Sequence, residues 1–112
     1  MCTNYLITAV YECVQDDPVP ANAVGNYLIV ITRTEDRPVN AKLECGVAWL
    51  PADTENRVTV IVYRQMIPGA SFIEAIQNAG TGNVQQVPGN CYPMGEYYST
   101  KAAFEVLGCP AN

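Results

Sequence analysis

Residues 41–68 constrain the fold most, because they contain two alternating runs joined by a polar turn. The first run, residues 41–50, carries an apolar residue at every second position from Leu43 to Trp49. The second run, residues 57–67, alternates in the same way and is rich in β-branched residues. Alternation with period two is the pattern of a strand with one buried face. The two runs and their short connection therefore predict an antiparallel hairpin.

The two faces of the second predicted strand differ in chemistry. One face is made of Val58, Val60 and Val62, which need a covering layer. The other face carries these residues: Thr59, Ile61, Tyr63 and Gln65. With Lys42 from the first strand, that face is either the solvent side of a half-buried sheet or a polar platform. On such a platform, Tyr63 would stack on a nucleobase.

Two segments upstream predict further strands. Residues 4–13 alternate, whereas residues 26–34 form an apolar run with little alternation, which indicates burial on both faces. Residues 19–25 contain Pro20 and Gly25, which both disfavour a strand. This segment is therefore expected to form at most a short edge segment. Turns are expected at residues 15–18 and 35–38.

The pattern changes to helices after residue 68. A capping-box pattern followed by glycine predicts a short helix over residues 71–79, and residues 84–87 are a candidate short strand. Residues 96–107 predict a helix whose apolar stripe includes Ala102 and Val106. We therefore expect one α+β domain over residues 1–112, with an antiparallel sheet and a C-terminal helix packed on one face.

Composition favours a protein that hides its surface against copies of itself or a partner. Hydrophobic residues make up 49% of the chain and charged residues only 15%, below the usual quarter. Little charge is therefore left to solvate a free surface. The net charge of −5 argues against a globally basic nucleic-acid binder. Six of the 11 acidic residues, however, fall in predicted turns, so the strands are nearly neutral; they are Asp16, Asp17, Glu35, Asp36, Asp53 and Glu55.

The chain has five cysteines and no histidine. No two cysteines have C-x-x-C spacing, so no zinc site is expected. The odd number leaves at least one thiol free or paired between chains, and Cys45 is expected to pack on the apolar face of its strand. The N-terminus lacks a signal-peptide pattern, and no apolar run is long enough to span a membrane. We therefore expect an intracellular protein with reduced cysteines.

The sequence offers little for catalysis. Without histidine the usual general base is absent. The two serines, Ser71 and Ser99, fit helix caps better than nucleophiles. Gly80-Thr81-Gly82 lacks the lysine of a phosphate-binding loop. We expect no enzymatic activity, no cofactor and no metal.

Several short motifs surround the predicted hairpin. They are Lys42-x-x-Cys45-x-Val47, a polar turn ending in Asn56-Arg57, the alternating strand and Pro68 near its end. Upstream stand Val19-Pro20-Ala21-Asn22 and Gly25. In these features the sequence resembles the coat proteins of single-stranded RNA bacteriophages (leviviruses), over roughly residues 4–68 and more loosely residues 84–107.

The resemblance implies an N-terminal hairpin and a dimer in which two sheets join edge to edge. The C-terminal helix of each chain would cover the partner's sheet, and dimers would close into an icosahedral shell. The shell would form in the bacterial cytoplasm and enclose genomic RNA, so the protein would be found in the virion. The implied partners are the protein itself and single-stranded RNA, with no membrane and no small-molecule substrate.

Carried across by position, the resemblance implies a set of RNA-facing residues. They are Lys42, Glu44, Asn56, Arg57, Thr59, Ile61, Tyr63 and Gln65. Glu44 and Ile61 depart from the hydroxyl or base ligands that the family often uses, and the acidic chain is short of cations for phosphate contacts. Cys91 and Cys109 fall near regions where subunits of the family meet, so the resemblance also implies inter-subunit disulfides there.

Two other classes of protein fit parts of the sequence. One is a small acidic α+β binding module, for example an inhibitor of a nucleic-acid enzyme. Such a mimic should display its carboxylates along one face, whereas here they cluster in turns. The other is a secreted domain held by disulfides, which would require a signal peptide and an even number of cysteines.

Overall fold

The computed structural model describes residues 1–5, 9–15, 17–52, 55, 58–64, 69–80, 82, 86 and 89–109. The chain divides into two compact units, each described here by itself. The first unit combines Met1–Tyr63 with Tyr98–Asn112, and the second is Arg64–Tyr97. The first unit contains all the strands and the α-helix found among the described residues.

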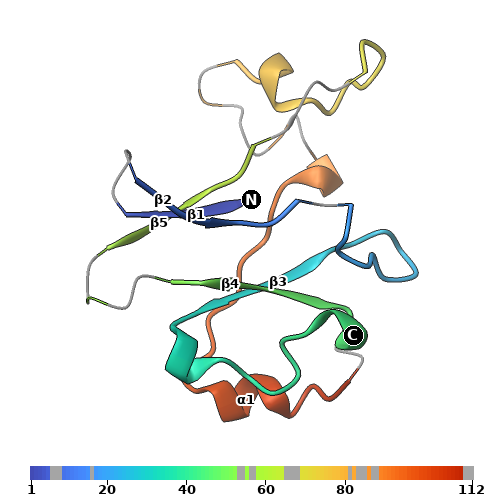
Figure 1. The fold of residues 1–112 in the computed structure, drawn as a ribbon. Helices are drawn as coiled ribbons and strands as arrows, with labels where there is room; N and C mark the ends of the chain where they lie inside the picture. Colours follow the sequence, from blue (N-terminus) through green and yellow to red (C-terminus); the bar gives the residue numbers. More distant parts are fainter. Residues whose placement is uncertain are drawn as a thin grey trace. The chain divides into compact units, whose positions relative to one another are not determined.

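The first unit contains a three-stranded antiparallel sheet (Figure 1). Its strands are β1 (Cys2–Tyr5), β2 (Ala9–Cys13) and β5 (Thr59–Val62), in the order β2–β1–β5. β1 and β2 form an N-terminal hairpin, and a disulfide joins Cys2 to Cys13 across it. Residues 4–13, predicted as one strand, therefore contribute to both strands of this hairpin.

A second, two-stranded sheet pairs β3 (Leu28–Thr32) with β4 (Val47–Pro51) in parallel. β3 confirms the strand predicted within residues 26–34. Parallel neighbours need a long crossover connection. Here the crossover, residues 33–46, contains two short 3-10 helices, η1 (Thr34–Asp36) and η2 (Leu43–Cys45).

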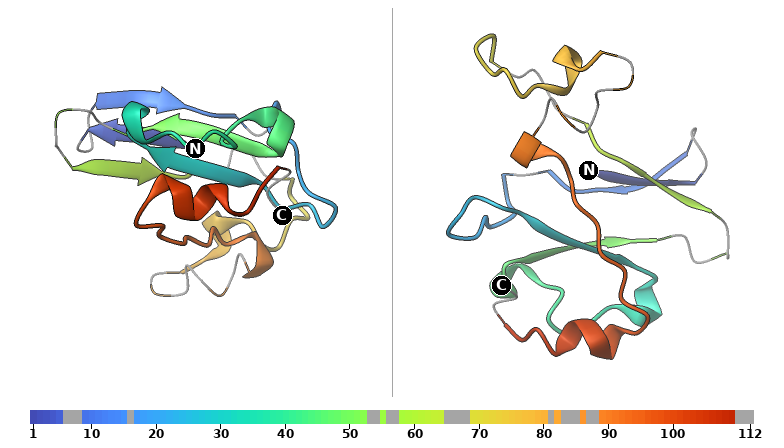
Figure 2. Two further views of the ribbon diagram at one scale, coloured as in Figure 1. Left: turned by 90° about the horizontal axis from the view of Figure 1, so that it is seen from below. Right: turned by 180° about the vertical axis from the view of Figure 1, so that it is seen from behind.

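The first unit is layered, with β4 in the middle. The Thr3 hydroxyl of β1 donates a hydrogen bond to the Pro51 carbonyl of β4 at 2.9 Å, which joins the two sheets. The helix α1 (Lys101–Glu105) lies on the side of the β3–β4 pair turned away from the three-stranded sheet (Figures 1 and 2). Because β4 is covered on both sides, Val47, Ala48 and Leu50 are all buried. The small antiparallel sheet and C-terminal helix confirm the predicted α+β class.

The predicted hairpin of residues 41–67 is wrong. β4 pairs with β3 and β5 pairs with β1, so the two alternating runs belong to different sheets. Gly46 explains part of the difference, because its φ of 73° ends η2 and the strand begins only at Val47. Alternation identifies the buried face of a strand but not its neighbour, which tertiary packing decides.

The main core lies between the two-stranded sheet and α1. Ala41, Cys45, Val47 and Phe104 form its buried cluster. A second disulfide joins the buried Cys45 to Cys109, just beyond α1. The prediction of reduced cysteines is therefore wrong, and Cys45 is bonded as well as packed. Cys109 is likewise not available for the predicted inter-subunit disulfide, because its sulfur is bonded within the chain.

α1 is shorter than the helix predicted over residues 96–107. The helix begins after Thr100, which is its N-cap and has an extended backbone. The Thr100 side-chain oxygen accepts a hydrogen bond from the Ala103 N–H at 3.2 Å. Phe104 is the buried residue of the helix, and Tyr98 packs against it edge to face with ring centroids 5.4 Å apart. The predicted apolar stripe is wrong, because Ala102 and Val106 are exposed.

Polar contacts fix α1 to the crossover. Asn40, which is buried, donates hydrogen bonds to the carbonyls of Gly108 at 2.9 Å and Phe104 at 3.4 Å. The Glu105 carboxylate accepts a hydrogen bond from the Val39 N–H at 2.9 Å. The two Asn40 hydrogen bonds satisfy carbonyl groups of the kind that a helix leaves unpaired at its C-terminus.

The described residues of the second unit form turns and two 3-10 helices, η3 (Ile76–Asn78) and η4 (Gly89–Cys91). The helix predicted over residues 71–79 is wrong. Ala75 has an extended backbone with ψ of 133°, and the Asn78 side chain donates to the carbonyl of Ile73 at 3.3 Å. Side chains that bind local carbonyls compete with helical hydrogen bonds. Most of residues 84–87, predicted as a strand, lie outside the described residues.

Loss of the Cys45–Cys109 disulfide should strongly destabilise the first unit. Its cysteines are 64 residues apart, and closing a loop of that length is expected to stabilise the fold by about 4 kcal/mol. Cys109→Ser removes the disulfide from the exposed end and leaves Cys45 packed. Its free energy of unfolding in urea should therefore fall by about 4 kcal/mol. Cys91→Ser, at a free exposed cysteine, should have little effect, and equal midpoints for the two variants would contradict the assignment.

The Thr100 cap should contribute measurably to stability. Thr100→Ala removes the side-chain oxygen that accepts from Ala103, and the loss of such a cap costs about 1 kcal/mol. Thr100→Ser keeps the hydroxyl and should remain near wild type in the same urea titration. If both variants lose equal stability, packing of the threonine methyl group accounts for the effect instead.

Candidate functional site

Among the described residues, those predicted to face RNA do not lie on one sheet, as the hairpin required. Lys42 and Glu44 are exposed, Lys42 at the start of η2 and Glu44 within it, next to the two-stranded sheet. Thr59 and Ile61 lie on β5 of the three-stranded sheet, and Tyr63 follows that strand. The predicted residues Asn56, Arg57 and Gln65 lie outside the described residues. RNA binding by these residues stays a prediction.

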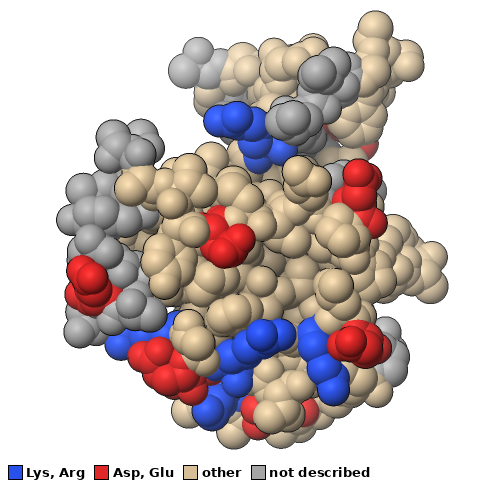
Figure 3. All heavy atoms as spheres, viewed as in Figure 1, with Lys and Arg blue, Asp and Glu red and all other residues tan. Residues whose placement is uncertain are grey.

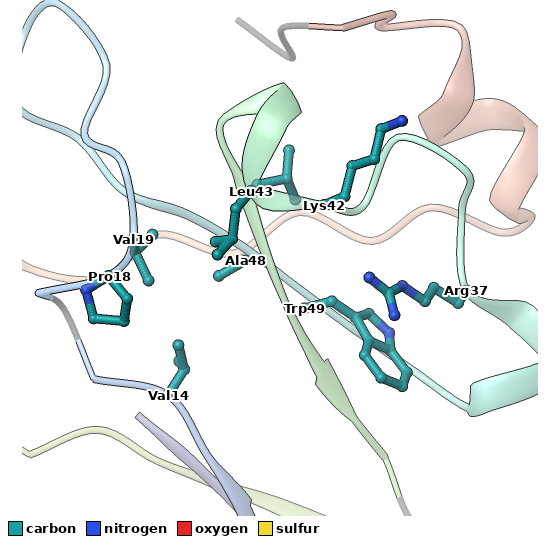
Figure 4. A pocket seen from close by; sticks show the side chains of 9 residues that line it. Val14, Pro18, Val19, Arg37, Lys42, Leu43, Ala48 and Trp49 are labelled. Carbon is teal, nitrogen blue, oxygen red and sulfur yellow. The ribbon is translucent and has the colours of Figure 1, made fainter.

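Lys42 instead lines a small pocket in the first unit (Figure 4). Its volume is about 210 Å³. Nine residues form its wall: Val14, Pro18, Val19, Arg37, Lys42, Leu43, Val47, Ala48 and Trp49. The residues come from the end of the N-terminal hairpin, from the crossover and from β4. Since β4 is enclosed between two layers, it provides the fixed base of the pocket.

Arg37 is the most firmly held charged group of the pocket. Its Nε and Nη2 both donate to the Ala41 carbonyl, at 3.1 and 2.7 Å. Its guanidinium carbon lies 4.4 Å from the centroid of the Trp49 ring, within the range of a cation–π interaction. Trp49 is held in turn, because its indole N–H donates to the Thr32 hydroxyl at 2.9 Å.

The wall of the pocket separates apolar from cationic groups. In Figure 4, Val14, Pro18 and Val19 lie on one side and Arg37 with Trp49 on the other. The Lys42 side chain extends away from the aliphatic side. No carboxylate is among the lining residues. The pocket therefore combines an aliphatic wall with two cationic side chains.

Outside the pocket, cations and carboxylates are interleaved. Figure 3 shows Lys and Arg next to Asp and Glu at the end of the first unit where α1 lies. η1 contributes Glu35 and Asp36 there, and the Lys101 ammonium donates to the Glu35 carbonyl at 3.1 Å. On the side that Figure 3 shows, the described residues therefore form no broad basic patch of the kind that attracts nucleic-acid phosphates.

The second unit contains one polar contact at an exposed cysteine. The Cys91 thiol donates to a Glu74 carboxylate oxygen at 3.2 Å. This hydrogen bond, with desolvation and the carboxylate charge, raises the pKa of the Cys91 thiol above its ordinary value. A raised pKa lowers the thiolate fraction at neutral pH and so slows disulfide exchange. The predicted inter-subunit disulfide at Cys91 stays a prediction.

The described residues offer no obvious metal centre. They contain no group of three or more His, Cys, Asp or Glu side chains placed to hold a metal ion. Among them, too, no helix is long and apolar enough to cross a membrane.

Sequence reasoning missed the two central residues of the pocket. Arg37 lay in a predicted turn and Trp49 on the apolar face of a predicted strand. The predicted turn and the predicted strand agree with the positions of Arg37 and Trp49 in the structure, but neither prediction reveals that the two side chains stack. The one available signal was the pairing of a turn arginine with the single tryptophan of the chain, and such a pair is meaningful only once the crossover is folded.

Comparison with known proteins supplies no relative. No family model matches the sequence, no curated protein matches it, and no solved structure matches the fold. Conclusions about function therefore rest on the residues themselves.

The contact between Cys91 and Glu74 predicts the pH dependence of thiol reactivity. Glu74→Gln weakens the hydrogen bond and removes the negative charge by which Glu74 raises the pKa of Cys91. The thiolate fraction at pH 8 should rise, and the reaction of Cys91 with a disulfide reagent should become faster. The rate is measured by release of the reagent's chromophore. Glu12→Gln, a matched change on β2 in the other unit, should leave the rate unchanged. A slower reaction in Glu74→Gln would contradict the assignment.

Proposed function

We propose that this protein is a structural subunit that associates with copies of itself through β5 and forms a coat around RNA. The observation that carries the proposal is that β5 is an edge strand of the sheet formed by the described residues, and that its sequence, Thr-Val-Ile-Val, is uncharged and mostly apolar. An edge strand with these properties is a template for pairing with another chain.

The two edges of the sheet differ in their capacity to pair. At β2 the register shifts between Thr3 and Asn4 of β1, so that Tyr11 has no partner, and β2 also carries Glu12. A bulge and a charge are the usual means by which an edge avoids pairing. β5 pairs with β1 in continuous register and contains no charged residue. The favoured contact is therefore β5 against β5 of a second copy.

Exposed apolar residues flank this edge. Val58 is 71% exposed, Ile61 53% and Tyr63 45%. An antiparallel pair of β5 strands would cover these side chains without bringing like charges together, because the strand has none. Two three-stranded sheets would then form one continuous sheet. This arrangement agrees with the edge-to-edge dimer implied by the resemblance to RNA-phage coat proteins.

The coat assignment within this class draws on the sequence motifs shared with RNA-phage coat proteins and on the low charge of the chain. Two disulfides in each subunit suit a particle that must persist outside a cell, since virion surfaces are oxidising. Among the described residues predicted to contact RNA, Lys42 is exposed and cationic and would reach a phosphate.

The disulfides also favour a second candidate, a secreted binding module, because small extracellular domains commonly depend on disulfides. The two candidates differ in size in solution. A module remains a monomer or dimer without nucleic acid, whereas a coat protein assembles.

A charge on the β5 edge should prevent assembly. After expression in bacteria and oxidative refolding with added single-stranded RNA, the wild type should elute as RNA-rich particles on size-exclusion chromatography with absorbance at 260 and 280 nm. Ile61→Lys should elute as a small species, because a lysine on an edge strand opposes pairing. Val24→Lys is the matched control, since Val24 is 78% exposed outside the sheet, and it should assemble like wild type.

Urea unfolding of both variants controls for misfolding, because Ile61 is largely exposed and its replacement should cost little stability. A wild-type protein that stays small and free of nucleic acid at several salt concentrations would overturn the coat assignment. Assembly of Ile61→Lys into normal particles would overturn the role of β5.

A further inference from the structure

We propose that the pocket lined by Arg37, Lys42 and Trp49 binds a small organic anion, with an apolar body and a single carboxylate. The charge of the lining is the first argument. Two cations and no carboxylate line the pocket, although the whole chain has a net charge of −5. The pocket is thus a local cationic site in an acidic protein, which favours an anionic ligand.

The aliphatic wall of the pocket requires the remainder of the ligand to be apolar. The apolar body of such a ligand would contact the aliphatic residues of the lining: Val14, Pro18, Val19 and Leu43. An inorganic anion alone would leave this wall exposed to water. A ligand with a hydrocarbon body covers it, and each buried methylene group contributes to binding.

The size of the pocket limits that body. A volume of about 210 Å³ is below the range of roughly 300–1,000 Å³ that is typical for drug-sized ligands. The ligand is therefore a short-chain or single-ring carboxylate and not a complete nucleotide or a long-chain fatty acid.

Arg37 has donors left to receive a carboxylate. Arg37 uses Nε and Nη2 on the Ala41 carbonyl, and its guanidinium still offers donors at Nη1. Its stacking on Trp49 fixes the plane of the guanidinium before a ligand arrives. Lys42 is exposed and adds a second positive charge with little reorganisation of the fold. A preorganised donor loses less entropy on binding.

The single tryptophan of the chain is part of the pocket, so its fluorescence reports occupancy directly. The test titrates the full-length protein with hexanoate, which does not absorb where tryptophan does. Hexanol is the uncharged control of equal chain length. Lys42→Gln removes one pocket cation and leaves the Arg37 contacts in place. Lys101→Gln is the matched control, because Lys101 lies on α1 outside the pocket.

Hexanoate should change the Trp49 emission with a saturable dependence on concentration, and hexanol should bind much more weakly. Lys42→Gln should raise the half-saturating concentration roughly five-fold, whereas Lys101→Gln should leave it unchanged. The proposal is overturned if hexanoate gives no saturable change, if hexanol is as effective, or if the two lysine variants behave alike. None of these outcomes bears on particle assembly, which is measured separately.

Discussion

The disulfide between Cys45 and Cys109 is the constraint on which the first unit depends. α1 has only one turn and a half, and a helix that short does not persist alone in water. The disulfide joins the end of α1 to the residue two positions before β4, and the Phe104 ring closes the core beside it. β4 is then enclosed between the helix and the three-stranded sheet. The small core of the unit is thereby completed by a covalent bond, as is common in short chains.

Local features of the sequence predicted much of the fold, whereas pairing could not be predicted. The apolar run of residues 26–34 became β3, and the valine alternation marked β5, because periodicity reports local burial directly. The partners of β4 and β5 depend on contacts between distant segments, about which periodicity carries no information. The helix over residues 71–79 failed for a local reason, since the Asn78 side chain bonds a carbonyl that a helix would use.

The candidate site follows the same division. Lys42 could be chosen from sequence because it is a cation next to an alternating run, but its companions could not. The hairpin prediction joined it to Thr59 and Tyr63, whereas the folded crossover brings it to a pocket with Arg37 and Trp49. Gly46, which has a left-handed backbone conformation, turns the chain just before β4. This turn separates Lys42 from the strand in which the hairpin prediction placed it. Such a turn is compatible with many sequences around it, so only the tertiary structure shows its effect.

The position of β1 has a consequence for biosynthesis. β1 (Cys2–Tyr5) lies far from β5 (Thr59–Val62) in the sequence, yet it is the central strand of its sheet and pairs on one side with β5. During synthesis β1 therefore lacks one neighbour until residue 62 has left the ribosome. During that interval the hairpin with β2 can form, but its other edge stays open. Chains on neighbouring ribosomes translating one messenger could pair at this exposed edge, so the nascent protein depends on rapid arrival of β5 or on a chaperone.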